Sequence, residues 1–525
     1  MTVCISSKPT RSKGLGFVTQ GTTEISRPAD TPGGSPRLDA VLRVLRPEYI
    51  FLVLALVTGI FVSVFLPAGA GLDEPFHVAR VEQVARGQVF PVLIAYSEDY
   101  PSETAEEKQT AALYGGTVDR NLYEIAFKNC VDYQVYGHDY PFPCWTDSDA
   151  GADARYGANG TTTTTFSNAS VNTPVTYAPY IVGFWLSRFL APSAYWMIVV
   201  MRLCGLALFA GLVFLAIRIV PVGKYALAFL ACTPNMVSSI SCVSADTVTN
   251  ALGFLFVALV LRLALAKRDE EIDLFPRLVG LGVVALCLSV SKMVFASLLL
   301  LLPLLLFMGP VSKSLKARAA VFATGILGIC LFFAWYSVIK SINTGAMWFA
   351  NIYPSQQTSY VLSHPAEFLQ SLANTLATAD VFQLETYGVG DQSRRFEDLP
   401  IVISLAVLVL SLLARDPREV RKVDAGQCAP LVAVSVAVAA ICFVLSCLAL
   451  YLSYSTVGAA EIDGMQARYY LISAALIATS ICMVARCAAP RLLAGKAPAL
   501  VVVALALVAS CAQHAAFVIE FVSTV

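Results

Sequence analysis

Long apolar runs constrain this chain more than any other feature of its sequence. The first extends from Tyr49 to Leu66. A helix of about 18–20 apolar residues can cross the hydrocarbon core of a bilayer, and these runs lack the alternation of barrel strands. Further runs of the same character lie at about 195–217, 225–243, 247–266, 276–291, 293–309, 319–340, 400–414, 430–452, 468–485 and 498–520. The pattern predicts an all-α polytopic membrane protein with about eleven transmembrane helices.

The composition agrees with this class. Hydrophobic residues make up 57% of the chain and charged residues 14%, whereas soluble domains carry roughly 25% charged residues. A long polar arm rich in Ser, Thr, Pro and Gly precedes the first apolar run. A signal peptide would place its apolar region much closer to Met1. We therefore expect a disordered cytoplasmic arm over residues 1–46 and an uncleaved first helix over 47–66.

Basic residues gather in the arm and in alternate loops between the apolar runs. The basic loops lie near 218–224, 262–277, 313–318, 415–422 and 486–496. The positive-inside rule assigns these segments to the cytoplasm. They share that side only if the apolar segment Tyr177–Leu190 does not cross, so we expect this segment, which contains Pro179, to be a juxtamembrane half-helix. The chain is thus predicted to lie in the plasma (inner) membrane, with a cytoplasmic N-terminus and an outer C-terminus.

This topology divides the chain into polar and membrane parts. An extracytoplasmic loop domain with juxtamembrane helices is expected over 67–193, and a second extracytoplasmic loop over 341–399. Transmembrane helices are expected over 194–340 and 400–525. Between Ala68 and Val175 there are fifteen Asp and Glu residues against six Lys and Arg residues, so the first loop domain is acidic.

Two cysteines stand apart from the others. Most of the fourteen cysteines lie within apolar runs, whereas Cys130 and Cys144 fall in the acidic outer segment. An outer compartment is oxidising, so we predict a disulfide between them; the alternative is two free thiols. Nothing in the spacing of Cys and His residues indicates a zinc site.

The first candidate for chemistry follows the first helix directly. Asp73 and Glu74 are adjacent carboxylates at the membrane surface, and His77 follows one turn later. Either carboxylate could act as a general base, or could cap the helix that Pro75 begins. An apolar stripe at helical spacing, starting at Val78, predicts that this helix is amphipathic and lies on the membrane.

Further polar residues stand at the ends of later apolar runs. Asp246 opens one such run and Asn250 lies a turn deeper. Helix capping and interhelical hydrogen bonding explain them at least as well as substrate binding. Lys292 lies between two apolar runs, and Arg468 with Tyr469 stands where an outer loop enters a helix. Both cations could bind a phosphate, or could be interfacial anchors.

Four short motifs follow one another along the chain. They are Asp73-Glu74-Pro75 with His77, Asn172-Thr173-Pro174 before Tyr177-Ala178-Pro179-Tyr180, Ser244-Ala245-Asp246 with Thr249-Asn250-Ala251, and Gln466-Ala467-Arg468-Tyr469-Tyr470. In this order and spacing they resemble an uncharacterised bacterial membrane family, domain of unknown function 2142. The resemblance covers most of the chain from about residue 49 to 520. That family in turn is similar to the GT-C superfamily of polytopic glycosyltransferases, which place an acidic residue in the first extracytoplasmic loop.

The resemblance implies a GT-C-like fold and an inverting membrane glycosyltransferase. Such an enzyme would move a sugar from a polyprenyl-phosphate donor to a cell-envelope glycan or glycoprotein on the outer face. Asp73 or Glu74 would be the general base, and Lys292 and Arg468 would stabilise the lipid phosphate that leaves. His77, Asp246, Asn250 and Tyr469 would complete the substrate site.

The partners are then a lipid-linked sugar, its acceptor and membrane lipids, with no nucleic acid. No cofactor is required, although a divalent metal could bind the carboxylates. Two alternatives remain open at this point: a transporter or lipid flippase for envelope components, and a non-catalytic envelope-assembly protein. Charges are sparse within the apolar runs, which argues against an ion-coupled carrier.

Overall fold

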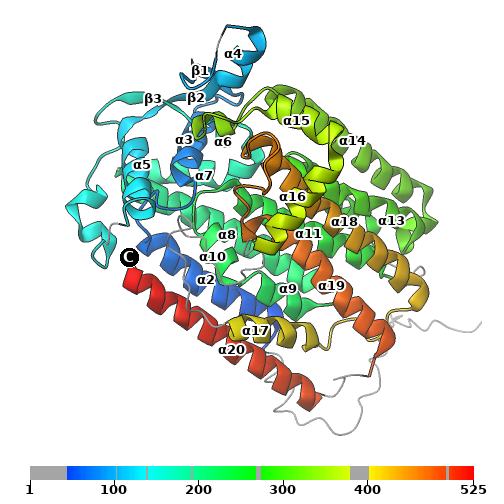
Figure 1. Cartoon of the computed structure of the whole chain (residues 1–525). Coiled ribbons are helices and arrows are strands. Elements are labelled where there is room, and N and C mark those ends of the chain that lie inside the picture. Colours follow the sequence, from blue (N-terminus) through cyan, green and yellow to red (C-terminus); the bar gives the residue numbers. More distant parts are fainter. Residues whose placement is uncertain are drawn as a thin grey trace, which may run out of the picture.

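The computed structural model describes residues 44–101, 103–137, 140–190, 193–267, 273–378, 401–491 and 496–524. Most of them are helical (Figure 1). Within these ranges, seven helices are long and apolar enough to cross a membrane. They are α2 (Pro47–Phe65), α8 (Ala194–Ile219), α11 (Ala245–Ala264), α14 (Leu315–Ile339), α18 (Ala425–Ser453), α19 (Leu471–Ala488) and α20 (Lys496–Thr524).

The remaining predicted spans are shorter or interrupted. The run expected as one helix over 225–243 forms two short helices, α9 (Lys224–Leu230) and α10 (Pro234–Ile240). Pro234 cannot donate a backbone hydrogen bond within a continuing helix, and it begins α10 instead. Three further apolar segments are short helices. These are α12 (Leu274–Ser289), the 3₁₀ segment η3 (Met293–Leu301) that continues into α13 (Leu302–Phe307), and α17 (Ile401–Leu413).

The first and last long helices, α2 and α20, run side by side in the same direction (Figure 1). Ile50, near the start of α2, shares a hydrophobic cluster with Val503 of α20. Further along, Thr58 Oγ1 lies 3.2 Å from His514 Nδ1, and the ring centroids of Phe61 and Phe521 are 5.5 Å apart. The start of α2 and the C-terminus therefore lie at opposite ends of the bundle.

Helix α7 (Pro174–Leu190) is the segment expected as a juxtamembrane half-helix. Immediately before it, Thr173 Oγ1 donates to the carbonyl oxygen of Val290, 2.7 Å away, at the turn after α12. Just after it, the backbone N–H of Ala194 donates to the carbonyl oxygen of Ala154, in the polar segment between α2 and α7, at 2.8 Å. The half-helix stays a prediction.

The first polar domain contains a sheet, so the chain is not purely helical. Its elements are α3 (Glu74–Ala85), β1 (Val92–Tyr96), α4 (Ala105–Ala111), β2 (Ala112–Asp119), α5 (Arg120–Gln134), the 3₁₀ turns η1 (Cys144–Thr146) and η2 (Ser148–Ala150), β3 (Thr161–Thr165) and α6 (Ser167–Ser170). The strands are antiparallel in the order β1-β2-β3, with Gly116 opposite Thr164. The threonine run forms β3 because β-branched residues favour the extended conformation.

Helix α3 does not lie on the membrane as its apolar stripe predicted. It is buried along nearly its whole length, because α5, α7 and β2 pack around it. Its polar residues have partners within the protein: Glu82 accepts hydrogen bonds from the Asp119 backbone at 2.9 Å and from the Tyr156 hydroxyl at 2.7 Å. The prediction was wrong because protein, rather than lipid, covers this helix.

The predicted disulfide is not formed either, and Cys130 and Cys144 are free thiols. The sulfur of Cys144 lies 3.0 Å from the hydroxyl oxygen of Tyr195 and 3.2 Å from the carbonyl oxygen of Phe65. The sulfur of Cys130 instead lies 4.0 Å from the carbonyl oxygen of Gly71. Each thiol therefore contacts a different part of the protein.

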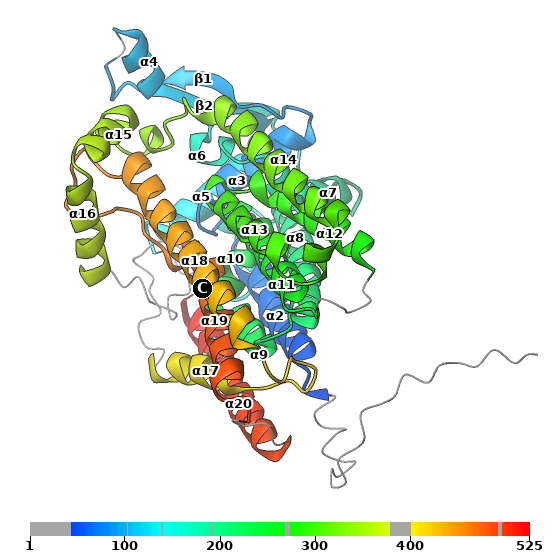
Figure 2. The ribbon, with the colours of Figure 1, turned by 90° about the vertical axis from the view of Figure 1, so that its right-hand side faces the viewer.

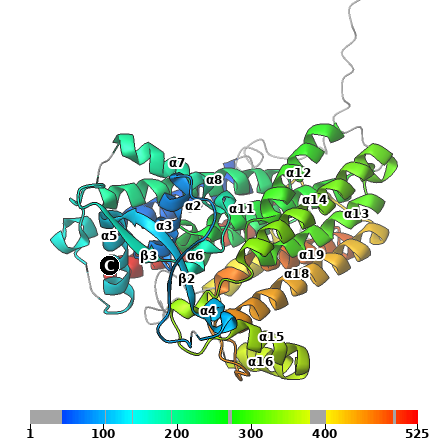
Figure 3. The same cartoon turned by 90° about the horizontal axis from the view of Figure 1, so that it is seen from above.

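The second polar segment packs against the first polar domain and α18. It contains η5 (Gly345–Met347), α15 (Pro354–Ser363) and α16 (Pro365–Thr378). The Asn343 side chain donates to the carbonyl of Thr110 in α4 at 3.1 Å. Figure 2 shows α15 and α16 alongside α18. Seen from above, the sheet and α5 lie to one side of α12, α13 and α14 (Figure 3).

Candidate functional site

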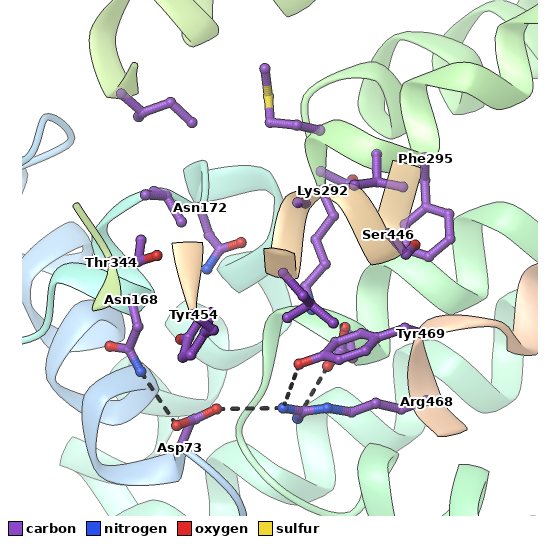
Figure 4. A pocket seen from close by; sticks show the side chains of 18 of the residues that line it. Asp73, Asn168, Asn172, Lys292, Phe295, Thr344, Ser446, Tyr454, Arg468 and Tyr469 are labelled. Atoms are coloured by element: carbon purple, nitrogen blue, oxygen red, sulfur yellow. Dashed lines mark hydrogen bonds and ion pairs between the residues drawn. The ribbon is translucent and has the colours of Figure 1, made fainter. Parts of the chain in front are cut away.

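A pocket of about 240 Å³ lies where the first polar domain meets the ends of the long helices. The structure brings most of the predicted site residues together around it (Figure 4). These residues are Asp73, His77, Asp246, Lys292, Arg468 and Tyr469. Glu74 and Asn250 are not among the residues that line it.

The backbone of Asp73 directs its carboxylate into the pocket. Asp73 has a left-handed backbone conformation, with φ 57° and ψ 7°. No other non-glycine residue in the described ranges has a positive φ. Its side chain makes no capping hydrogen bond to α3. Instead, one carboxylate oxygen lies 3.4 Å from Asn168 Nδ2 and the other 3.4 Å from Arg468 Nη2. The conformation costs about 1–3 kcal/mol and persists here without a capping bond to offset it.

Glu74 has a structural role instead of the catalytic role considered for it. Its carboxylate is fully buried and pairs with Arg202, with an Nε–Oε1 distance of 2.8 Å. The backbone N–H groups of Gly71 and Val243 also donate to it, at 2.9 and 2.8 Å. Both oxygens are therefore occupied by internal donors, and Glu74 ties the start of α3 to α8 and to the loop before α11.

Capping of α11 was one of the two interpretations of Asp246, but Ser244 is the residue that caps this helix. The Ser244 hydroxyl accepts from the Asp246 backbone at 3.1 Å. The Asp246 carboxylate forms an ion pair with Lys292 and another with Arg468, whose Nη1 lies 3.3 Å away. It is only 4% exposed. Asp246 thus holds the two cations next to each other.

The two cations also share the ring of Tyr469. Lys292 Nζ and Arg468 Cζ each lie 5.2 Å from its centroid. Lys292 occupies the turn between α12 and η3, and Arg468 lies in the 3₁₀ turn η6 (Ala467–Tyr469) before α19. Arg468 Nε is buried and has no hydrogen-bond partner within the described part of the chain. Buried donors are nearly always satisfied, so this atom is available to a ligand oxygen.

His77 contributes a neutral imidazole to the pocket. Burial lowers the pKa of His77 to about 4, so the ring is uncharged at neutral pH. Its Nδ1 lies 2.7 Å from the Tyr177 hydroxyl, which accepts a hydrogen bond from Asn172 Nδ2 at 3.4 Å. His77 and Tyr177 therefore form a polar but uncharged part of the wall.

The rest of the pocket wall combines apolar and polar side chains. The apolar ones come mostly from η3 and from the ends of α14 and α18, and they are Val171, Met293, Val294, Phe295, Ile339, Ala449 and Leu450. The polar ones are Asn168, Asn172, Ser291, Thr344, Ser446 and Tyr454. A pocket with both charged and apolar groups suits a ligand with an anionic head and a hydrocarbon chain.

Asn250 does not line the pocket, and three other residues were not indicated by the sequence. Asn250 is buried in α11, and its Nδ2 has no partner in the described ranges. Sequence reasoning missed Asn168, Tyr454 and Arg202. An arginine in the middle of an apolar helix was the available signal for Arg202, since such a charge requires a buried partner. Across the described residues, no cluster of three or more His, Cys, Asp or Glu side chains could hold a metal ion.

No curated protein and no solved structure matches the chain. The model of a family described as predicted membrane protein, DUF2142, matches residues 56–477. The matched region runs from within α2 into α19 and includes every residue named in the pocket. The chain therefore belongs to the DUF2142 family of membrane proteins.

Proposed function

We propose that this protein is an inverting glycosyltransferase of the GT-C type. It moves a sugar from a polyprenyl-phosphate donor to a cell-envelope acceptor at the outer membrane face. The observation that carries the proposal is the position of the Asp73 carboxylate, which faces the paired cations Lys292 and Arg468 inside one pocket that also has apolar side chains.

The cations supply the site for the lipid phosphate. Asp246 pairs with both Lys292 and Arg468 and so places the two cations together, and Arg468 also pairs with Asp73. Arginine presents a planar fork of donors that matches phosphate oxygens. The buried Nε of Arg468 has no partner among the described residues and becomes satisfied when a phosphate oxygen approaches. The apolar side chains of the pocket, among them Met293, Val294 and Leu450, accommodate the first part of the lipid chain.

Asp73 supplies the base. It is the remaining carboxylate of the pocket, and its side chain is 31% exposed. Its contact with Arg468 is long, at 3.4 Å. A donor phosphate competes for Arg468 and leaves the Asp73 carboxylate free to accept a proton.

The proposed transfer needs no reactant other than the donor and the acceptor. The acceptor hydroxyl loses its proton to Asp73 as its oxygen attacks the anomeric carbon. The bond between that carbon and the phosphate oxygen breaks, and the electron pair leaves with the polyprenyl phosphate. The leaving phosphate needs charge stabilisation rather than protonation, which Lys292 and Arg468 provide.

A carrier is the less favoured function. The pocket around Asp73 and a second cavity at the opposite end of the bundle have no lining residue in common. Helix α11 extends between them and is buried almost throughout. These features support a reaction at one membrane face over passage through the bundle.

The test compares a strain lacking the gene with strains that carry the wild-type chain, Asp73→Asn or Asp153→Asn. Asp153 is an exposed carboxylate of the same polar domain and is the matched control. Mass spectrometry of lipid extracts and of envelope glycans reports the donor and the product.

The deletion and Asp73→Asn strains should both accumulate a lipid-linked sugar and lack one glycan substituent, while Asp153→Asn resembles wild type. Wild-type glycans in an Asp73→Asn strain with normal protein levels would contradict transfer by this site. Unchanged glycans in the deletion strain as well would favour the non-catalytic alternative.

A further inference from the structure

A second cavity, of about 390 Å³, lies at the end of the bundle opposite the Asp73 pocket. Basic side chains from five segments converge on it, with apolar side chains between them. The basic residues are Arg218, Lys224, Arg262, Arg277 and Arg418. No carboxylate lines this cavity among the described residues. We call it the basic cavity.

Its position follows from the helix directions. Arg218 lies at the end of α8, the helix that begins beside the first polar domain, and Arg262 lies at the end of α11, which begins at the Asp73 pocket. Arg277 lies in the first turn of α12. Arginines at helix ends mark the membrane–water boundary, so the basic cavity lies at the level of lipid head groups.

Arg418, Lys224 and Arg262 are already engaged within the protein. Arg418 forms a bidentate pair with Glu48, at 2.6 and 2.7 Å, and also binds Asp416. Lys224 Nζ donates to the carbonyl oxygens of Ile217 and Arg218 at the end of α8. Arg418 and Lys224 help to fix the cavity wall and contribute less to binding an external anion.

The side-chain charges of Arg218 and Arg277 are not neutralised by a carboxylate of the described residues. Neither forms an ion pair within the part of the chain that the structure describes. Arg277 Nη1 is buried and has no hydrogen-bond partner in those ranges. A buried, charged donor without an acceptor is costly, which points to an anion that the protein normally holds there.

We propose that the basic cavity binds the phosphate head group of an anionic phospholipid. A phospholipid provides both the phosphate and an apolar glycerol–acyl region that matches the apolar side chains between the arginines. Basic pockets between transmembrane helices recognise such head groups, and each nearby cation adds to the affinity. This site is separate from the glycosyl-transfer site and does not depend on that proposal.

An internal anion is the competing occupant. The sequence between Lys267 and Leu274 includes Asp269, Glu270 and Glu271, a few residues before Arg277. The experiment therefore needs a variant in which these carboxylates are neutralised. It also needs inorganic phosphate as a separate ligand, to distinguish a lipid head group from a free anion.

The test uses the purified full chain in detergent, mixed with equal amounts of phosphatidylglycerol and phosphatidylcholine. Native mass spectrometry measures which lipid is retained. Arg218→Gln and the double variant Arg218→Gln with Arg277→Gln are compared with a control double variant, Arg318→Gln with Arg491→Gln, whose arginines are exposed and lie outside the cavity. Melting in neutral detergent checks that each variant folds.

Wild type and the control should retain phosphatidylglycerol in preference to phosphatidylcholine. The double variant should retain it on the order of tenfold less, and Arg218→Gln several-fold less. Equal retention of the two lipids by wild type, or undiminished retention by a folded Arg218→Gln variant, would overturn the proposal. So would full competition by inorganic phosphate, or lipid preference that appears only after Asp269→Asn, Glu270→Gln and Glu271→Gln are combined.

Discussion

The guanidinium of Arg202 and the carboxylate of Glu74 form a fully buried ion pair, in which Arg202 Nε lies 2.8 Å from Glu74 Oε1. The remaining Arg202 donors bind the carbonyl oxygens of Ser63, Leu66 and Pro67 around the end of α2. The neighbouring carboxylate, Asp73, faces the pocket instead. Two adjacent acidic residues therefore have separate roles, and substitution should distinguish them.

Glu74→Ala should destabilise the protein severely. It leaves the Arg202 charge buried without its partner, and breaking a buried pair costs about 3–5 kcal/mol. We expect much less protein in the membrane and a clearly lower melting temperature in detergent. Glu124→Ala is the control, because Glu124 is 60% exposed and its ion pair with Arg120 spans 3.9 Å. Equal melting of the two variants would contradict the structural role of Glu74.

Asp73→Gly should separate stability from activity. Glycine adopts positive φ without steric cost, so this change relieves backbone strain while removing the carboxylate. The melting temperature should stay the same or rise, whereas glycosyl transfer should fall about 10²–10⁴-fold, as for loss of a general base. Asp73→Ala should lose transfer equally but melt at a lower temperature, because alanine disfavours φ near 57°. A destabilised Asp73→Gly variant would show that Asp73 supports the fold.

Arg468→Lys should impair transfer although it preserves the charge. Lysine offers a single ammonium in place of a fork, so it cannot bind Asp246 and a phosphate oxygen together as we propose for Arg468. We expect at least a tenfold loss of transfer, on the scale of one bidentate contact, with little change in melting. Arg120→Lys, at a side chain that is 48% exposed, is the matched control. Full activity in Arg468→Lys would remove the bidentate contact from the mechanism.

His77 should make the stability depend on pH. Burial lowers the pKa of His77 to about 4, below the value of about 6.5 expected in the unfolded chain. The unfolded state therefore binds a proton first, and stability falls as the pH drops below about 6.5 towards 4. Between pH 7 and 5 the loss attributable to His77 should be up to about 2 kcal/mol.

The measurement is the melting temperature in detergent at pH 7 and pH 5. Glutamine can keep a hydrogen bond to Tyr177 but does not titrate, so His77→Gln should lose less stability between these two values than wild type. His364→Gln is the control, since His364 is exposed. An identical decrease in wild type and His77→Gln would indicate that other groups control acid sensitivity.

Local sequence patterns were sufficient to single out Asp73, Lys292 and Arg468. Each is a charge at the end of an apolar run, where lipid meets water, and such positions are visible without knowledge of the fold. The role of Glu74 was not accessible in this way, because its partner Arg202 lies 128 residues further along the chain. Only tertiary packing decides which of two adjacent carboxylates turns inward.

The same limit applies to α3 and to the region 225–243. An apolar stripe indicates that a helix face is covered, but it does not say whether lipid or protein covers it. Hydrophobicity alone also cannot distinguish one long helix from α9 and α10, although Pro234 marks the break. Features that depend on long-range contacts, such as the β1-β2-β3 sheet over α3, escaped prediction for this reason.

The parallel pairing of α2 and α20 has a consequence for biosynthesis. Thr58 and His514 are 456 residues apart in the chain, so α2 leaves the ribosome long before its neighbour exists. Until α20 is inserted, Thr58 and Phe61 must face lipid, other helices or an insertion factor. A chain that stops before α20 should therefore remain an incompletely assembled membrane intermediate, open to quality-control proteolysis.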